Sequence, residues 1–280
     1  IGHTGYDDLP DILDLLLRLA PELDFDLEFE DEMHKAALGG ARLTDPKSID
    51  ALVTLGGDGT LLRGARLLDG AQAPILGINL GRVGFLTTCG SDEIEVALRS
   101  LAARTYIAEC RMALHAIAVD GKGANRQEWR ALNDFVVHKG GFARVVRVGL
   151  SVDGDSIGTY AADGVIISTP TGSTAYSLSA GGPVVVPTVE SILLTPISAH
   201  ALGVRPLVVS PDAEVVVDTT QSSEELMVTV DGQVGTNLVP GEKLVVRRSA
   251  NPVIIIRMPH NSFFERMRVK LGWGGPPEGQ

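Results

Sequence analysis

The stretch Gly56-Gly57-Asp58-Gly59-Thr60 decides how this chain folds. The apolar run 51–55 before it is short and partly β-branched, which predicts a buried strand. After it, apolar residues recur at helical spacing, at Leu61, Leu62, Ala65 and Leu68. The glycines therefore lie at a strand-to-helix turn, where open α/β sheets bind ligands. Backbone N–H groups at such a turn, with a helix N-terminus behind them, are suited to phosphate.

A single carboxylate, Asp58, stands in the middle of this turn. An acid among phosphate-binding amides adds repulsion unless it has a task. Two tasks fit this position, namely general base, or ligand of a metal ion that the phosphates carry. A simpler alternative is that Asp58 caps the helix after a tight turn.

Composition bounds the remaining possibilities. The chain has 280 residues, enough for one large or two ordinary domains, and 44% of them are hydrophobic. A formal net charge of -11 disfavours nucleic acid and anionic membranes as partners. The two cysteines show no metal-binding spacing, and no apolar run is as long as a membrane span. The first residues lack the features of a signal peptide, so we expect a cytoplasmic protein.

Strand and helix patterns alternate over the first hundred residues, which predicts a Rossmann-like α/β domain over 1–102. Phe25, Leu27 and Phe29 alternate with acidic residues and predict a half-buried strand. From 103 to 260 the pattern changes to short apolar runs separated by turn residues, which predicts a β-sandwich-like domain. The segment 261–280 is expected to form a C-terminal helix, over 263–271, that packs back on the first domain.

Two further stretches carry polar groups suited to a nucleotide. Hydroxyls, one proline and one glycine gather in the loop 168–177, where Tyr176 offers a ring for stacking on a base. Asp163 lies just upstream, and Asn133-Asp134 interrupts an apolar run. Each has an ordinary alternative, namely a turn entering a helix, a turn acid, and a β-bulge. The sequence contains neither a P-loop nor a G-x-G-x-x-G turn after a strand, which leaves hydride-transfer dinucleotide sites unsupported.

Taken together, these stretches resemble the bacterial form of the NAD kinase family. The glycine turn and the Thr-Pro-Thr-Gly-Ser-Thr-Ala-Tyr loop in register are its most specific pieces. The matching stretches come in the family's order: Gly56–Thr60, Asn79–Leu86, Asn133-Asp134, Asp163–Tyr176, His200–Pro206, Asp231-Gly232-Gln233 and Phe264–Trp273.

The resemblance implies transfer of the γ-phosphoryl group of ATP, with Mg²⁺ or another divalent cation, to the adenosine 2′-hydroxyl of NAD. Inorganic polyphosphate is an alternative donor. The site would lie between the two domains, and no metal would be held by protein ligands alone. A homodimer or homotetramer is expected by resemblance only.

The resemblance also assigns roles to residues. Asp58 would be the general base and would contact NAD together with Gly59. The phosphate turn would consist of Gly56, Gly57, Gly59 and Thr60. The NAD site would be lined by Asn133, Asp134, Asp163, Thr171, Thr174, Ala175, Tyr176, Ser177, Ser179 and Gln233. The family has Glu where this chain has Asp134, so the ribose-binding carboxylate is one methylene shorter here.

Two alternatives to this function remain at this point. Another kinase that shares the Gly-Gly-Asp-Gly-Thr turn would act on a sugar phosphate or a lipid, although the later motifs have no place in such families. A dinucleotide sensor that has lost its chemistry would bind NAD without turnover.

Overall fold

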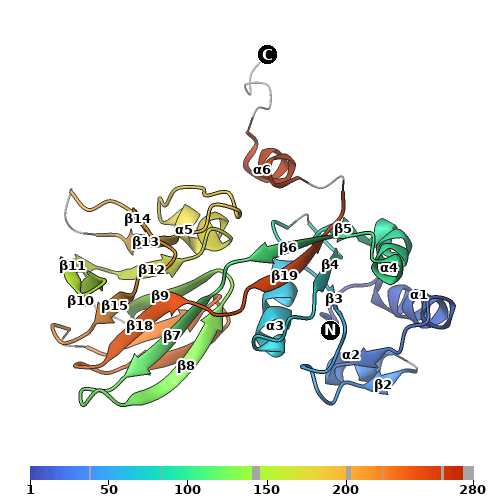
Figure 1. Ribbon diagram of the computed structural model, residues 1–280, viewed down its shortest axis with the longest axis horizontal. Coiled ribbons are helices and arrows are strands. Elements are labelled where there is room, and N and C mark those ends of the chain that lie inside the picture. Colours follow the sequence, from blue (N-terminus) through green and yellow to red (C-terminus); the bar gives the residue numbers. More distant parts are fainter. Residues whose placement is uncertain are drawn as a thin grey trace. The chain divides into compact units, whose positions relative to one another are not determined.

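A computed structural model describes residues 1–37, 39–82, 84–140, 146–199, 203–222, 224–259 and 262–273 of the chain (Figure 1). The chain forms two compact units. The first contains residues 1–110 and 253–280, and the second contains residues 111–252. Each unit is described on its own.

The first unit is built on a sheet in the order β3, β4, β19, β6, with the short strand β5 also beside β4. Its strands are β3 (Leu52–Leu55), β4 (Ile75–Asn79), β5 (Cys89–Gly90), β6 (Ile107–Arg111) and β19 (Val253–Arg257). β4 pairs in parallel with β3, β5 and β19. This arrangement confirms the predicted parallel α/β layer.

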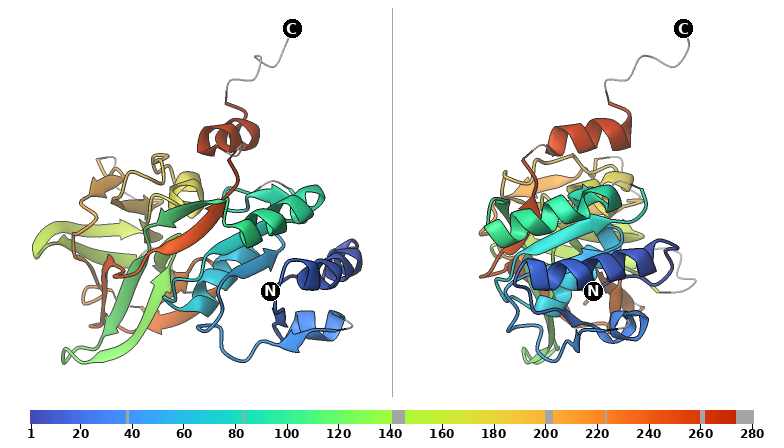
Figure 2. Two further views of the ribbon diagram at one scale, coloured as in Figure 1. Left: turned by 45° about the vertical axis from the view of Figure 1, so that its right-hand side comes forward. Right: turned by 90° about the vertical axis from the view of Figure 1, so that its right-hand side faces the viewer.

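Helices cover both faces of this sheet (Figure 2). They are α1 (Leu9–Glu22), α3 (Asp58–Leu68) and α4 (Ile94–Ala103), the last entered through η1 (Ser91–Glu93). α1 and α4 share a core with Leu55 and Ile78 on one face. On the other face, Gly64 lets α3 approach Leu52 and Thr54, because a Cβ there would lie 2.9 Å from the Leu52 side chain. Among the described residues, no helix has the length and apolar character needed to cross a membrane.

The strand predicted from Phe25 to Phe29 is mostly absent. Only β1 (Glu28–Phe29) forms, and it pairs with β2 (Ala41–Arg42) in a separate two-stranded sheet that also carries α2 (Asp31–Ala36). The preceding residues end α1 instead, since Asp24 has a φ of 58° and the Phe25 N–H donates to the Ala20 carbonyl.

The second unit consists of two six-stranded sheets whose described pairings are antiparallel. The first sheet runs β11 (Asp155–Ala162), β10 (Val146–Val152), β15 (Val215–Asp218), β18 (Lys243–Arg248), β7 (Leu114–Val119) and β8 (Asn125–Ala131). The second runs β14 (Leu207–Val209), β13 (Ile192–Ile197), β12 (Gly164–Ser168), β9 (Asp134–Lys139), β16 (Leu226–Val230) and β17 (Val234–Leu238). Apolar side chains from both sheets form one core, which confirms the predicted sandwich.

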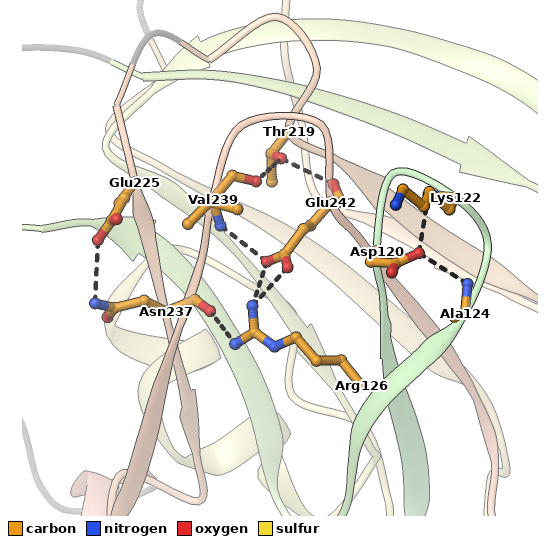
Figure 3. A network of polar contacts seen from close by, with 9 residues as sticks. All are labelled: Asp120, Lys122, Ala124, Arg126, Thr219, Glu225, Asn237, Val239 and Glu242. Atoms are coloured by element: carbon orange, nitrogen blue, oxygen red, sulfur yellow. Dashed lines mark hydrogen bonds and ion pairs between the residues drawn. The ribbon is translucent and has the colours of Figure 1, made fainter.

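Polar contacts join the two sheets around Arg126 of β8 (Figure 3). Its guanidinium lies 2.6 Å from both oxygens of the buried Glu242 carboxylate and donates to the Asn237 carbonyl of β17 at 2.8 Å. The Val239 N–H donates to the same carboxylate, and the Thr219 hydroxyl donates to the Glu242 carbonyl. A buried charge is costly unless it is paired and hydrogen-bonded, and Glu242 meets both conditions.

The C-terminal helix α6 (Phe263–Leu271) forms where the sequence predicted it and belongs to the first unit. Ser262 caps it by accepting a hydrogen bond from the Glu265 N–H at 3.1 Å. The Lys270 ammonium lies 5.0 Å from the centroid of the Phe85 ring, a cation–π contact between α6 and the turn after β4.

The observed division of the chain differs from the predicted boundaries at 102 and 260. The apolar run 253–256 lies within the range 103–260 predicted for the β-rich domain, but Ile255 pairs with Ile75 of β4 in the first unit. A strand buried inside a parallel sheet and a strand of a sandwich core are both short and apolar, so their sequences do not distinguish them.

Candidate functional site

The glycine turn connects β3 to α3 as predicted. Gly56 has a φ of 150°, which favours glycine, and a Cβ on it would lie 2.4 Å from Oγ1 of the buried Thr60. Gly57 is the N-cap of α3, and a Cβ there would meet no heavy atom within 4 Å. Gly59 is exposed on the first turn of the helix. Space therefore remains beside Gly57 at the N-terminus of α3, where an approaching phosphate would need it.

Asp58 is the first residue of α3, and its half-buried carboxylate accepts three backbone hydrogen bonds. The donors are consecutive N–H groups of the turn after β4: Phe85 at 2.7 Å, Leu86 at 3.0 Å and Thr87 at 3.2 Å. From the sequence alone, this turn is recognised only as the stretch Asn79–Leu86 of the family resemblance, without a link to Asp58. Its contact with Asp58 spans 27 to 29 residues, which no local pattern reveals.

In the second unit, the loop after β12 packs on the backbone at the start of β9. The Thr169 hydroxyl donates to the Leu132 carbonyl at 2.6 Å, and the Thr169 N–H donates to the Asn133 carbonyl at 2.9 Å. A Cβ on Gly172 would lie 2.2 Å from that Asn133 carbonyl oxygen. The glycine therefore permits the close contact, and the structure brings Asn133-Asp134 together with the predicted nucleotide loop.

Asp231 holds the same segment from a third direction. With Gly232 and Gln233 it forms the three-residue β16–β17 hairpin loop, in which Asp231 and Gly232 have positive φ, 50° and 66°. The Asp231 carboxylate accepts hydrogen bonds from the N–H groups of Leu132 at 3.1 Å, Asn133 at 2.7 Å and Asp134 at 3.2 Å. The sequence correctly indicated the turn, but the inward carboxylate was missed because its partners lie almost 100 residues away.

Asp134 is the buried acid of this cluster, with 3% of its surface exposed. Among the described residues, no group donates a hydrogen bond to its carboxylate. Burial, with a smaller contribution from the neighbouring Asp231 charge, raises the pKa of Asp134 to about 7. Near neutral pH, the carboxyl group is thus able either to donate or to accept a hydrogen bond.

The loop continues through η2 (Gly172–Thr174) into the short helix α5 (Tyr176–Ser179). The buried Thr171 hydroxyl accepts from the Arg111 guanidinium at 3.3 Å, and the Thr174 hydroxyl donates to the Thr171 carbonyl. Arg111 itself is 2% exposed and was not anticipated, because a lone arginine at a strand end has no distinctive pattern.

The side chains of α5 divide into an outer and an inner set. Tyr176 and Ser179 are exposed, and Ala175 and Thr174 are half-buried. The Ser177 hydroxyl is fully buried and lies 2.8 Å from the Thr195 hydroxyl. The Ser177 hydroxyl thus takes part in the packing of the loop, and its expected contact with NAD stays a prediction.

Two predicted residues lie apart from this cluster or at its rim. Asp163 precedes β12 and pairs with Lys139 at 2.6 Å, whereas the nucleotide loop follows the other end of that strand. Five strand residues separate the two ends by about 16 Å. Gln233 follows the Asp231 turn and is exposed. The matched stretch beginning at His200 starts in residues outside the described part of the chain.

No group of three or more His, Cys, Asp or Glu side chains within the described ranges is arranged to hold a metal ion. The turn around Asp58 supplies one carboxylate, whose oxygens already accept hydrogen bonds from three backbone amides. This donor set suits a cation that arrives with phosphate ligands of its own better than a resident metal.

Comparisons with known proteins agree on one family. The model described as the ATP-NAD kinase N-terminal domain matches residues 18–106, and the model described as the ATP-NAD kinase C-terminal domain matches residues 132–258. An NAD kinase of Gemmatimonas aurantiaca is 58% identical over 98% of this chain and 95% of its own length. An NAD kinase of Heliobacterium modesticaldum is 45% identical over 81% of this chain and 80% of its own length.

Two solved structures have the same fold. Yeast NADH kinase complexed with NADH aligns with a TM-score of 0.82 and 25% identity, over 99% of this chain and 87% of that one. An NAD kinase from Archaeoglobus fulgidus in complex with ATP aligns with a TM-score of 0.76 and 28% identity, over 97% and 96%.

Proposed function

Because this chain belongs to the ATP-NAD kinase family, we propose that it transfers the γ-phosphoryl group of ATP to the 2′-hydroxyl of the adenosine ribose of NAD, giving NADP. The observation that carries this proposal is the Asp58 carboxylate at a glycine turn that leaves space beside Gly57 at the helix N-terminus. Phosphoryl transfer needs positioning, charge neutralisation and a residue that orients the nucleophile, and this turn offers all three.

On the donor side, Gly56, Gly57, Gly59 and Thr60 form the turn that faces the phosphates. The N-terminus of α3 supplies partial positive charge at this turn without a P-loop. Asp58 acts as the general base and takes the proton of the ribose hydroxyl as the phosphoryl group arrives. We further propose that Mg²⁺ comes with ATP, since the phosphates provide most of the ligands that this ion requires and it neutralises their charge.

On the acceptor side, Asn133 and Asp134 hold ribose hydroxyls of NAD. Thr171, Thr174 and Ala175 line the dinucleotide site, and Gly172 lets this loop pack against the Asn133 carbonyl. The exposed ring of Tyr176 is available for stacking, and Ser179 and Gln233 complete the rim.

We retain Asp163 as a proposed NAD contact. It precedes β12, whereas the proposed NAD-binding loop follows the other end of that strand. We also propose that the enzyme is a cytoplasmic homodimer or homotetramer, for which size-exclusion chromatography with light scattering is the direct measurement.

The test of the function is a coupled assay of NADP formation. NAD and NADH are offered as acceptors against ATP and polyphosphate as donors, with fructose 6-phosphate and diacylglycerol as control acceptors. We expect NADP from NAD and ATP and no phosphorylation of the controls. Binding of NAD without turnover at any ATP concentration would contradict the proposal.

A further inference from the structure

We propose that Gly84, together with the backbone amides of residues 85–87, positions Asp58 so that one carboxylate oxygen, Oδ2, is presented as the proton acceptor. The inference rests on the proposed function, because it takes Asp58 as the general base. It adds a positioning residue from a turn that contributes no side chain to the reaction.

The hydrogen bonds distinguish the two oxygens of Asp58. Oδ1 accepts from the Leu86 and Thr87 N–H groups, whereas Oδ2 accepts only from the Phe85 N–H. A carboxylate offers about two lone-pair sites on each oxygen. Oδ1 is therefore saturated, and Oδ2 keeps one site for an incoming proton.

In the proposed reaction, Oδ2 of Asp58 accepts the proton. The O–H bond of the ribose 2′-hydroxyl breaks and its proton forms a bond to Oδ2. The hydroxyl oxygen forms a bond to the γ-phosphorus of ATP. The bond between that phosphorus and the bridging oxygen breaks, and its electron pair leaves with ADP.

Any side chain at position 84 would occupy space that the Asp58 carboxylate fills. Its φ lies outside the left-handed region, so its backbone conformation permits alanine. A Cβ there would nevertheless lie 1.9 Å from Asp58 Oδ1 and 2.6 Å from Asp58 Cγ. Both distances are far below contact distance, so the carboxylate and a side chain at residue 84 compete for one space.

Thr87 Oγ1 would also lie 2.6 Å from a Cβ at residue 84, but this hydroxyl can move away at little cost. It has no hydrogen-bond partner in the described part of the chain, so rotation about χ1 breaks no bond. The Asp58 carboxylate cannot avoid a methyl group at residue 84 at so little cost, because the closest contact, 1.9 Å, is with its own Oδ1. To make room it has to move away from the three amides that hold it. A displacement of about 1 Å at a reacting group costs on the order of 10²-fold in rate.

The experiment compares four variants with the wild-type enzyme: Gly84→Ala, Gly81→Ala, Asp58→Ala and the double variant Asp58→Ala/Gly84→Ala. Gly81 is the matched control, because it lies in the same turn and a Cβ on it would contact only the Tyr6 ring, at 3.4 Å. For each protein, kcat, the KM values for NAD and ATP, and the melting temperature are measured.

We expect Gly84→Ala to lower kcat at least tenfold and on the order of 10²-fold, with both KM values within threefold of wild type. Gly81→Ala should keep wild-type kcat. In the Asp58→Ala background the space is vacated, so adding Gly84→Ala should change neither kcat nor the melting temperature further. A purely structural glycine would instead lower stability equally in both backgrounds.

Two outcomes would overturn the inference: a Gly84→Ala enzyme with more than about a tenth of wild-type kcat, short of the expected loss, or an equal cost of Gly84→Ala with and without Asp58. If Gly84→Ala does not fold, recovery of the melting temperature in the double variant supports the inference, and failure to recover contradicts it. A wild-type enzyme that forms no NADP refutes the proposed function, whereas the melting temperatures still test the competition between residues 58 and 84.

Discussion

Asp58 in the first unit and Asp134 in the second are both acids at the start of a regular element, yet their surroundings differ. Asp58 begins α3 and accepts three backbone hydrogen bonds. Asp134 begins β9, is more deeply buried, and accepts none in the described part of the chain. The pKa of Asp134 is raised to about 7, mainly because burial disfavours its charged form.

The two units nevertheless use the same device, three consecutive N–H groups aimed at one carboxylate. In the first unit the carboxylate is the proposed base itself. In the second it belongs to Asp231, which takes the N–H groups of residues 132–134 and leaves Asp134 without donors. In both units, three consecutive backbone amides are directed at one acid, Asp58 or Asp231, whereas none is directed at the Asp134 carboxylate among the described residues.

The largest expected effect is that of Asp58→Asn, which keeps the size of the side chain but cannot accept a proton at neutral pH. We expect kcat to fall on the order of 10²–10⁴-fold, because a transition-state interaction is lost, while NAD affinity changes modestly. The protein should fold with a lowered melting temperature, since the new NH₂ group faces backbone donors. A folded variant with more than about a tenth of wild-type kcat, well short of the general-base range, would remove Asp58 from the role of base.

The next effect is a pH dependence of stability centred on Asp134. Its pKa is 3.8 ordinarily and about 7 when folded, so between these values the folded protein keeps a proton that the unfolded chain has released. The free energy of unfolding therefore falls as pH rises through this window, by about 4 kcal/mol in total. Asp134→Asn should remove most of this slope and raise the melting temperature at pH 8 but not at pH 4. Parallel melting curves for variant and wild type across this range would contradict the assignment.

Asp231→Asn tests the source of the asymmetry. The variant keeps the turn-forming tendency of residue 231 but loses one acceptor oxygen and the charge. We expect a loss of about 3 kcal/mol of stability in urea unfolding, because a buried N–H is left without its charged partner. The pKa of Asp134 should also fall, since a like charge is removed. Asp120→Asn is the control, because Asp120 accepts amides in an exposed hairpin and its loss should hardly matter.

The smallest effects concern ligand binding at Asp134. Asp134→Ala should raise the KM for NAD by a factor that corresponds to about 1–3 kcal/mol of lost binding free energy, as expected when a sugar hydroxyl loses its partner. Asp134→Glu restores the reach of the family's carboxylate and should leave catalysis within a few-fold of wild type. Steady-state kinetics with NAD as the varied substrate measures both variants, and an unchanged KM in Asp134→Ala would place this residue outside the NAD site.

Local signals in the sequence were sufficient for the turns. The glycine turn at residues 56–60 and the Asp231-Gly232 hairpin follow from adjacent residues, because glycine content and apolar period act over a few positions. The same is true of α6, whose apolar spacing and serine cap lie within one segment.

What the sequence could not reveal depends on contacts between distant residues. The amides that hold Asp58 come from the turn after the next strand, and those that hold Asp231 come from β9 and the residues before it. Asp163 and Thr171 are only eight residues apart in the chain, yet the extended strand between them separates the two. The prediction that placed the apolar run 253–256 in the β-rich domain was wrong for the same reason, since only pairing decides which sheet this strand joins.

The place of β19 has a consequence for the order in which the protein acquires its structure during synthesis. This strand lies between β4 and β6 and is translated after the whole sandwich. Nascent domains usually fold in the order in which they are made. Here the sheet lacks the strand between β4 and β6, and only the short β5 accompanies β3 in pairing with β4, until residue 257 has left the ribosome. The unit translated first is therefore the last to be completed.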